Sequence, residues 1–286
     1  MCKSRHDALV RVATRSSPGY AVSGAVVIVC SRHCMIWRNG AGDQLGEKVH
    51  IILFIFSSCA NCVPPRYCNI DFGVLATLIG IVLLQIVLTY DVGCQWSKNL
   101  RHRIQDLPPE MQIPDTTKVD VAIPGWHING HGESCRNNFN LSYMEGAGRT
   151  VGEDVETVWV GTNPLAPSIR EMGPAAWHDT LNDHWNGWNF HKIVRFHTFS
   201  LIFIHFSFVY LSLIPGTFLL KRFNEAVEMS AKQKQIFDQL SATFAPEIVN
   251  KWEAMVVEWN ANPKAPNPYQ EPKSRKYHLS EIMSFF

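Results

Sequence analysis

Charged side chains are scarce in this sequence, and their signs nearly cancel. Asp, Glu, Lys and Arg make up 18% of the 286 residues, and the formal net charge is +1 at pH 7. Such a chain sets up no overall field that would attract nucleic acid or an anionic membrane. Contact with a polyanion would therefore depend on a local patch. "KNLRHR" at 98–103 is a candidate, although the same run would also suit a solvated helix face.

A secretory signal is not evident, because the opening "MCKSRHDALVRVATRSSPG" is polar and basic and has no hydrophobic core. The eight cysteines are spread through a chain of ordinary size. This pattern argues against a disulfide scaffold and predicts reduced thiols in an intracellular compartment. We see no internal repeat. The nine tryptophans are expected to be mostly core or interface anchors.

Three stretches contain no Asp, Glu, Lys or Arg: 49–65, 72–90 and 197–216. The second and third approach the length of a membrane span, so one interpretation is a small protein with two or three transmembrane helices. The second stretch also suits a short buried helix at 72–78. It would be followed by a strand that is covered on both faces, "GIVLLQIVLTYD". That strand would place Asp91 at the carboxyl edge of a sheet, where open α/β sheets gather functional groups.

Helical patterns dominate the rest of the chain. A short helix is expected over 152–161, and 218–259 is expected to be helical with Pro246 in the first turn of its second helix. The segment 98–123 is polar and contains prolines, which predicts loops or short helices, and the tail at 263–286 is expected to be extended or disordered. Between them, one aromatic helix face recurs at helical spacing: Trp177, Leu181, Trp185 and Trp188.

The segment "HINGHGESC" spaces His127, His131 and Cys135 four residues apart. On a helix these side chains would share one face, as half of a metal site requires, and Cys94 could supply a fourth ligand for zinc. Glycines at 130 and 132 argue against a regular helix. The alternative is a loop with polar histidines and a buried thiol.

Acidic residues form a second candidate site. Asp91 follows the predicted strand, where it could simply cap the next helix. Glu153 and Glu156 lie three residues apart, and a favourable interaction with a helix dipole would explain an acid there without catalysis. A carboxylate next to another strand-end carboxylate would also suit Mg²⁺ or Mn²⁺.

Several segments together resemble one known family. They are "VVIVCSRHCMIWRNGAGDQLGEK", "RYCNIDF", "YDVGCQWSKNL", "IPGWHINGHGESC", "GAGRTVGEDVETVW", "TNPLAPSIREMGPAAWHDTLNDHWNGWNFHKIV" and "WNANPKAPNPYQ". In this order they resemble the transposases of the Kyakuja-Dileera-Zisupton class, of the fungal type. The likeness covers most of 23–270, and a collinear set of this length is far more specific than any one motif.

The resemblance implies a DDE-type transposase with an RNase H-like α/β core of mixed sheet and flanking helices. Three acids of such enzymes hold two divalent metals, Mg²⁺ or Mn²⁺, at a phosphodiester of DNA. Asp91 matches the second acid, and Glu153, or alternatively Glu156, matches the third. The His/Cys insert of the family matches His127, His131 and Cys135. Transposon DNA as the partner and the nucleus as the location follow from the same resemblance, and nothing indicates an oligomeric state.

Two departures from the family pattern alter this expectation. The first acid of the family lies upstream of "CSRH", and nothing here matches it, because Asp7 has no hydrophobic strand before it. We therefore expect a truncated, inactive remnant, or alternatively a domesticated module that binds DNA or zinc without catalysis. In addition, 49–65 and 197–216 interrupt the pattern and have the composition of translated introns. A mature message that contains both segments would contradict that hypothesis.

The expected organisation follows from these matches. We predict a poorly defined segment at 1–22, a partial transposase core at 23–196 with a suspected insertion at 49–65, and a suspected apolar insertion at 197–216. A helical region at 217–262 and a proline-rich tail at 263–286 complete the chain.

Overall fold

The computed structural model describes residues 22, 24–44, 67–196, 217–262 and 264–270. The chain divides into two compact units, Met1–Met229 and Ser230–Phe286. The apolar stretches at 49–65 and 197–216 and most of the proline-rich tail lie outside the described residues. The predicted domain boundaries therefore stay a prediction.

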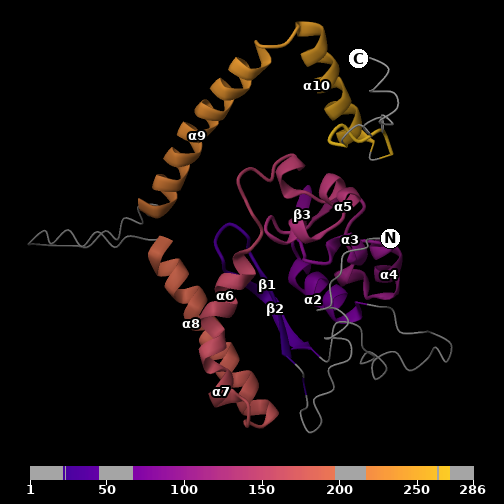
Figure 1. Ribbon diagram of the computed structural model, residues 1–286. Coiled ribbons are helices and arrows are strands. Elements are labelled where there is room, and N and C mark those ends of the chain that lie inside the picture. Colours follow the sequence, from indigo (N-terminus) through magenta and orange to yellow (C-terminus); the bar gives the residue numbers. More distant parts are fainter. Residues whose placement is uncertain (1–21, 23, 45–66, 197–216, 263, 271–286) are drawn as a thin grey trace, which may run out of the picture. The chain divides into compact units, whose positions relative to one another are not determined.

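The described chain is mixed α/β, with small sheets and many short helices (Figure 1). Its elements in chain order are β1 (Gly24–Val29), β2 (Ile36–Gln44), α2 (Cys68–Leu78), β3 (Gln85–Thr89), α3 (Gly93–Trp96), α4 (Leu100–Arg103), β4 (Lys118–Ala122), α5 (Glu133–Asn138), α6 (Asp154–Thr162), α7 (Ala166–Ile169), α8 (Pro174–Phe196), α9 (Thr217–Ser241) and α10 (Pro246–Ala261). Short 3₁₀ turns lie between several of them, including η4 (His127–Gly130).

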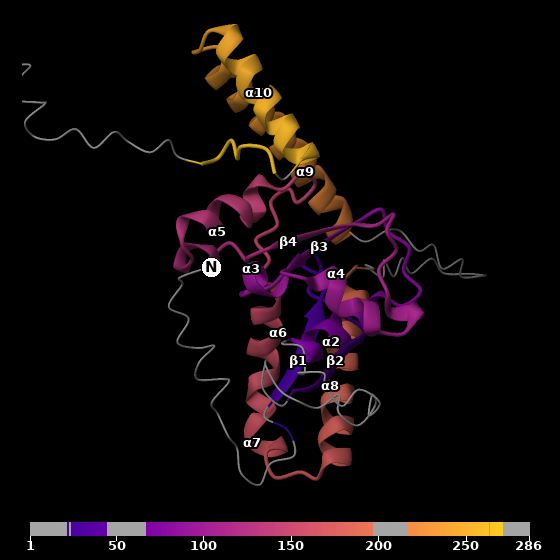
Figure 2. The ribbon, with the colours of Figure 1, turned by 90° about the vertical axis from the view of Figure 1, so that its right-hand side faces the viewer.

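The antiparallel hairpin β1–β2 is packed on both faces, which explains why the β1 sequence "GAVVIV" is apolar throughout. Successive side chains of a strand point to opposite faces. Val26 packs into the cluster that contains α2, whereas Val27 packs into the cluster that contains α6 and α8. Figures 1 and 2 show α6 and α8 running beside this hairpin. The hairpin was not predicted from the sequence.

The second sheet is a parallel pair, in which β3 runs beside β4 from Gln85↔Lys118 to Thr89↔Ala122. The expectation of a short helix followed by a strand is confirmed by α2 and β3. The expectation of loops or short helices over 98–123 is wrong for Lys118–Ala122, which forms β4 through its pairing with β3. However, β3 is only partly buried rather than covered on both faces, since none of its residues is fully buried. Within the described residues it pairs with β4 alone. Leu88 packs into the same cluster as Val26, so one core joins the two sheets through α2.

The membrane interpretation is wrong for 72–90, because this stretch forms α2 and β3. None of the helices in the described part of the chain combines the length and hydropathy that a membrane crossing needs. The other two apolar stretches fall outside that part.

A buried ion pair fixes α2 against α3 and α4. The Arg103 guanidinium donates from Nε to Asp71 Oδ2 at 2.7 Å and from Nη2 to Asp71 Oδ1 at 3.0 Å. The indole N–H of Trp96 donates to Asp71 Oδ1 at 2.8 Å, and Asp71 is only 4% exposed. In the run "KNLRHR", Leu100 is therefore part of the core and Arg103 pairs with the buried Asp71. The other basic residues of the run are exposed: Lys98, Arg101 and His102.

The predicted aromatic helix is confirmed as α8, whose Leu181 and Trp185 are buried against the hairpin. The Trp185 indole N–H donates to Thr162 Oγ1 of α6 at 3.2 Å, which fixes the two helices to one another. The helical region after 217 is also confirmed as α9 and α10, and Pro246 begins α10 as predicted.

Candidate metal-binding sites at the end of β3

The chain leaves β3 through Tyr90 and reaches Asp91 before α3 begins. Asp91 does not cap this helix, because the N-cap is Val92 and no side chain bonds to it. Gly93 starts α3 in close contact with β4: a Cβ there would lie 2.9 Å from Val121 Cγ1 and 3.0 Å from the Ala122 carbonyl oxygen. Glycine at this position therefore allows the start of α3 to lie this close to β4.

Glu153 reaches the same end of β3 from the other direction. The preceding Gly152 has a φ of +76°, and a Cβ at this position would lie 2.9 Å from Thr89 Cγ2. Gly125 donates its N–H to the Val151 carbonyl at 2.8 Å, and Trp126 donates its N–H to Glu153 Oε1 at 2.8 Å. The loop after β4 and the segment before α6 are thus bonded together.

His127 lies between the two acids. Its Nδ1 is 3.1 Å from Asp91 Oδ1, and its Nε2 is 3.6 Å from Glu153 Oε2. Asp91 Oδ1 is itself buried and makes no hydrogen bond of good geometry. One imidazole thus connects two carboxylates that are far apart in the sequence, where a cation would be well placed.

A second cluster lies next to the acids and consists of Cys94, His131 and Cys135. All three residues are buried, their ligand atoms lie within 4.8 Å of one another, and the two cysteines carry thiols. The Cys94 Sγ is 3.6 Å from His131 Nδ1. Zinc–sulfur and zinc–nitrogen bonds in a tetrahedral site would put these atoms about 3.5 Å apart. The donor set and its spacing therefore fit a zinc ion.

His131 faces both sites. Its side chain is fully buried, and its Nε2 lies 3.9 Å from Asp91 Oδ1. The opposite ring nitrogen faces Cys94. The two clusters are therefore adjacent rather than separate.

The predicted site residues are only partly brought together. Three of the four suggested zinc ligands form the thiol cluster, whereas His127 lies with the acids. The spacing of four residues does not correspond to one helix face, because η4 ends at Gly130, His131 is extended, and α5 begins after Gly132. Glu153 contacts His127, while Glu156 lies exposed in the first turn of α6.

Burial perturbs two groups next to Glu153. Desolvation raises the pKa of Asp154, and a backbone hydrogen bond and the positive charge of Lys192 offset this only in part. Desolvation also raises the pKa of the Cys34 thiol, whose Sγ donates to the Asp154 carbonyl at 3.1 Å. Neither residue was singled out from the sequence, which carries no motif for them.

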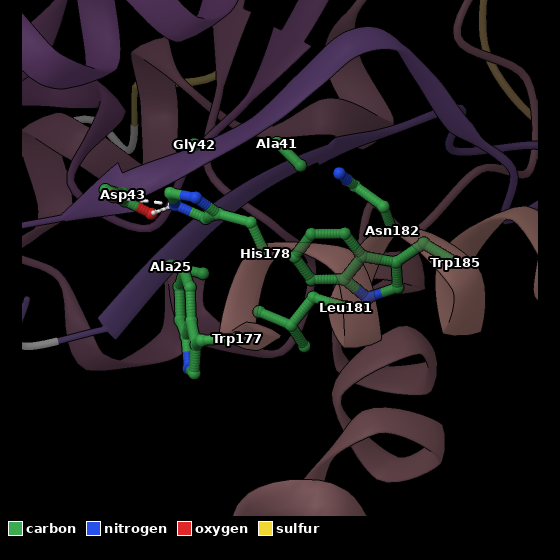
Figure 3. Close-up of a pocket in the computed structure, with 9 residues that line it drawn as sticks. All are labelled: Ala25, Ala41, Gly42, Asp43, Trp177, His178, Leu181, Asn182 and Trp185. Carbon is green, nitrogen blue, oxygen red and sulfur yellow. Dashed lines mark hydrogen bonds and ion pairs between the residues drawn. The ribbon is translucent and has the colours of Figure 1, made fainter. Parts of the chain in front are cut away.

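A cavity of about 340 Å³ lies elsewhere, between the hairpin and α8. The residues around it are Ala25, Ala41, Gly42, Asp43, Trp177, His178, Leu181, Asn182 and Trp185. Small residues of the hairpin face large rings of α8, which leaves the space open. Figure 3 shows Trp177 and Trp185 on either side of Leu181, and His178 Nε2 pairs with Asp43 at 2.9 Å. This cavity shares no residue with the acids or the thiol cluster.

Comparison with known proteins agrees with the sequence resemblance. No curated protein and no solved structure matches the chain. The sequence profile of the Kyakuja-Dileera-Zisupton (KDZ) transposases matches residues 1–189, which is more than half of the chain. This chain therefore belongs to the KDZ transposase family.

Proposed function

We propose that this chain is a transposase-derived protein whose Asp91 and Glu153 form two corners of a DDE-type metal site on an RNase H-like core. The convergence of both carboxylates on His127 carries the proposal. The parallel pair β3–β4, with an acid just after β3, is consistent with such a core. Glu153 is preferred to Glu156 as the third acid, because Glu156 is exposed and lies beyond the contacts of His127.

Manganese is the divalent cation that we expect to bind best. Mg²⁺ prefers an all-oxygen shell, whereas Mn²⁺ also accepts an imidazole nitrogen. His127 would either become a ligand or move aside when the cation binds. As a ligand, the imidazole favours Mn²⁺ over Mg²⁺.

We further propose that the 286 residues alone do not cleave DNA efficiently. Two-metal chemistry needs a bridging set of acids. Within the described ranges no third carboxylate contacts His127, and the family resemblance places the first acid upstream of "CSRH". The ancestral activity would be strand cleavage and transfer at transposon ends, which would place the protein in the nucleus.

Manganese binding followed by electron paramagnetic resonance tests the site. Asp91→Asn and Glu153→Gln should each weaken Mn²⁺ binding at least about tenfold, because each removes a charged ligand. The matched control Glu156→Gln removes an exposed acid and should leave binding unchanged. Equal Mn²⁺ affinity in all four proteins would exclude the assignment.

Plasmid nicking tests the proposed loss of catalysis. We expect little or no nicking with Mn²⁺. Robust nicking that disappears in both Asp91→Asn and Glu153→Gln would instead show an active enzyme and contradict the inactive reading. Nicking that persists in both variants would come from a contaminant or another site.

A second candidate function is a DNA-binding module with a structural zinc, supported by the preformed thiol cluster. Purified protein should then contain one zinc and should bind duplex DNA more weakly as salt rises, because electrostatic DNA binding releases counterions. Zinc-free protein with unchanged DNA binding would exclude this candidate.

A further inference from the structure

We infer that His131 is a positioning residue. It would couple zinc binding at the thiol cluster to the Asp91 carboxylate. The inference rests on the proposed function only in treating Asp91 as a ligand of the divalent cation. It goes further in giving the thiol cluster a role at the neighbouring acids.

The geometry of one buried ring carries the inference. His131 presents Nδ1 to Cys94 Sγ at 3.6 Å and Nε2 to Asp91 Oδ1 at 3.9 Å, and none of its side chain is exposed. Asp91 Oδ1 is buried and has no hydrogen bond of good geometry. The second nitrogen of the ring thus lies near a buried carboxylate oxygen that His127 Nδ1 also approaches, at 3.1 Å.

Zinc chemistry decides which nitrogen carries the proton. A histidine binds zinc through a deprotonated nitrogen and keeps its proton on the other one, which is commonly donated to a carboxylate. Because Nδ1 faces the thiols, zinc would fix the proton of His131 on Nε2, opposite Asp91. Without zinc, no metal bond fixes the proton of His131 on Nε2.

The coupling must act in both directions, because a binding free energy shared by two sites is reciprocal. Asp91 makes His131 a stronger zinc ligand, and zinc-bound His131 orients Asp91 for the divalent cation. Glu153 contacts His127, so we expect it to have no part in the coupling.

Zinc affinity provides a test that does not depend on the divalent cation. It is measured by competition with a chromophoric chelator, on the full chain and without added Mn²⁺. Loss of an outer-shell carboxylate typically weakens metal binding 10–100-fold, and the 3.9 Å contact predicts the lower end for Asp91→Asn, about tenfold. The matched control Glu153→Gln should bind zinc as the wild type does.

His131→Cys separates zinc binding from positioning. A third thiolate can replace the imidazole as a zinc ligand, but it has no second nitrogen to face Asp91. This variant should keep one zinc per chain and an unchanged circular dichroism spectrum, while its Mn²⁺ affinity should fall several-fold.

Each outcome has a distinct meaning. Equal zinc affinity in the wild type and in Asp91→Asn would overturn the inference, as would a wild-type chain that binds no zinc. Unchanged Mn²⁺ affinity in zinc-loaded His131→Cys would also overturn it. If Asp91→Asn weakens zinc binding but the wild type never binds Mn²⁺, the coupling stands and the proposed acid site fails.

Discussion

Removing the buried carboxylate of Asp71 should strongly destabilise the protein. Asp71→Ala leaves the Arg103 guanidinium, whose side chain is only 12% exposed, without its counter-charge. It also removes the acceptor of the Trp96 indole N–H. Breaking one partner of a buried ion pair costs about 3–5 kcal/mol, a large part of the unfolding free energy of a typical domain.

The measurement is urea unfolding followed by circular dichroism. A matched control is Asp115→Ala, which breaks the exposed pair that Asp115 forms with Arg101 of the same helix, α4. Exposed pairs contribute about 0–1 kcal/mol, so this variant should unfold almost like the wild type. The double variant Asp71→Ala/Arg103→Met should recover part of the loss, because it removes the unpaired charge. A loss below about 1 kcal/mol in Asp71→Ala would refute the reasoning about this pair.

The remaining predictions concern packing and pH. In Gly161→Ala the new Cβ would lie 2.7 Å from Trp188 Cζ3, so we expect overpacking to cost about 1–3 kcal/mol in denaturant unfolding. The same change in α8, Gly187→Ala, meets no atom within 4 Å and should instead stabilise by up to about 1 kcal/mol; equal effects would contradict the packing argument. Because burial raises the pKa of Asp154, its charged form costs stability once the pH rises through the folded-state value. Asp154→Asn should therefore raise the melting temperature at pH 7. The gain should shrink as the pH falls through the raised folded-state pKa and should be lost below about pH 3.9, where the wild-type carboxyl is protonated in both states. A gain that grows on acidification would refute this.

Local sequence patterns predicted the helices and strands that have a regular spacing of apolar residues or a long apolar run. The spacing of Trp177, Leu181 and Trp185 gave α8, and the aliphatic run before Asp91 gave β3. β4 was missed, because "KVDVA" is short and mixed and is held by its pairing with a strand distant in sequence. The hairpin was missed because its turn uses Cys34 at positive φ instead of a typical glycine turn, and because β2 is irregular, with Asn39 at positive φ inside the strand.

The candidate site was also predicted only in part from the sequence. The family resemblance pointed to Asp91 and to Glu153 or Glu156, and the structure brings Asp91 and Glu153 to His127. Spacing alone could not separate His127 from the thiol cluster. A short 3₁₀ turn is followed by the extended His131, which changes the direction of the chain. The spacing of residues in the sequence does not predict where such a change of direction occurs.

The imidazole between the two acids has a consequence for the order of folding and metal uptake. Two neighbouring carboxylates repel one another, and such a pair would ordinarily wait for a cation before it could assemble. Here the ring of His127 lies between the two carboxylates, with Nδ1 3.1 Å from Asp91 Oδ1 and Nε2 3.6 Å from Glu153 Oε2. The acid pair can therefore form while the chain folds without any divalent ion. A chelator should strip this site of its ion and leave the surrounding fold intact.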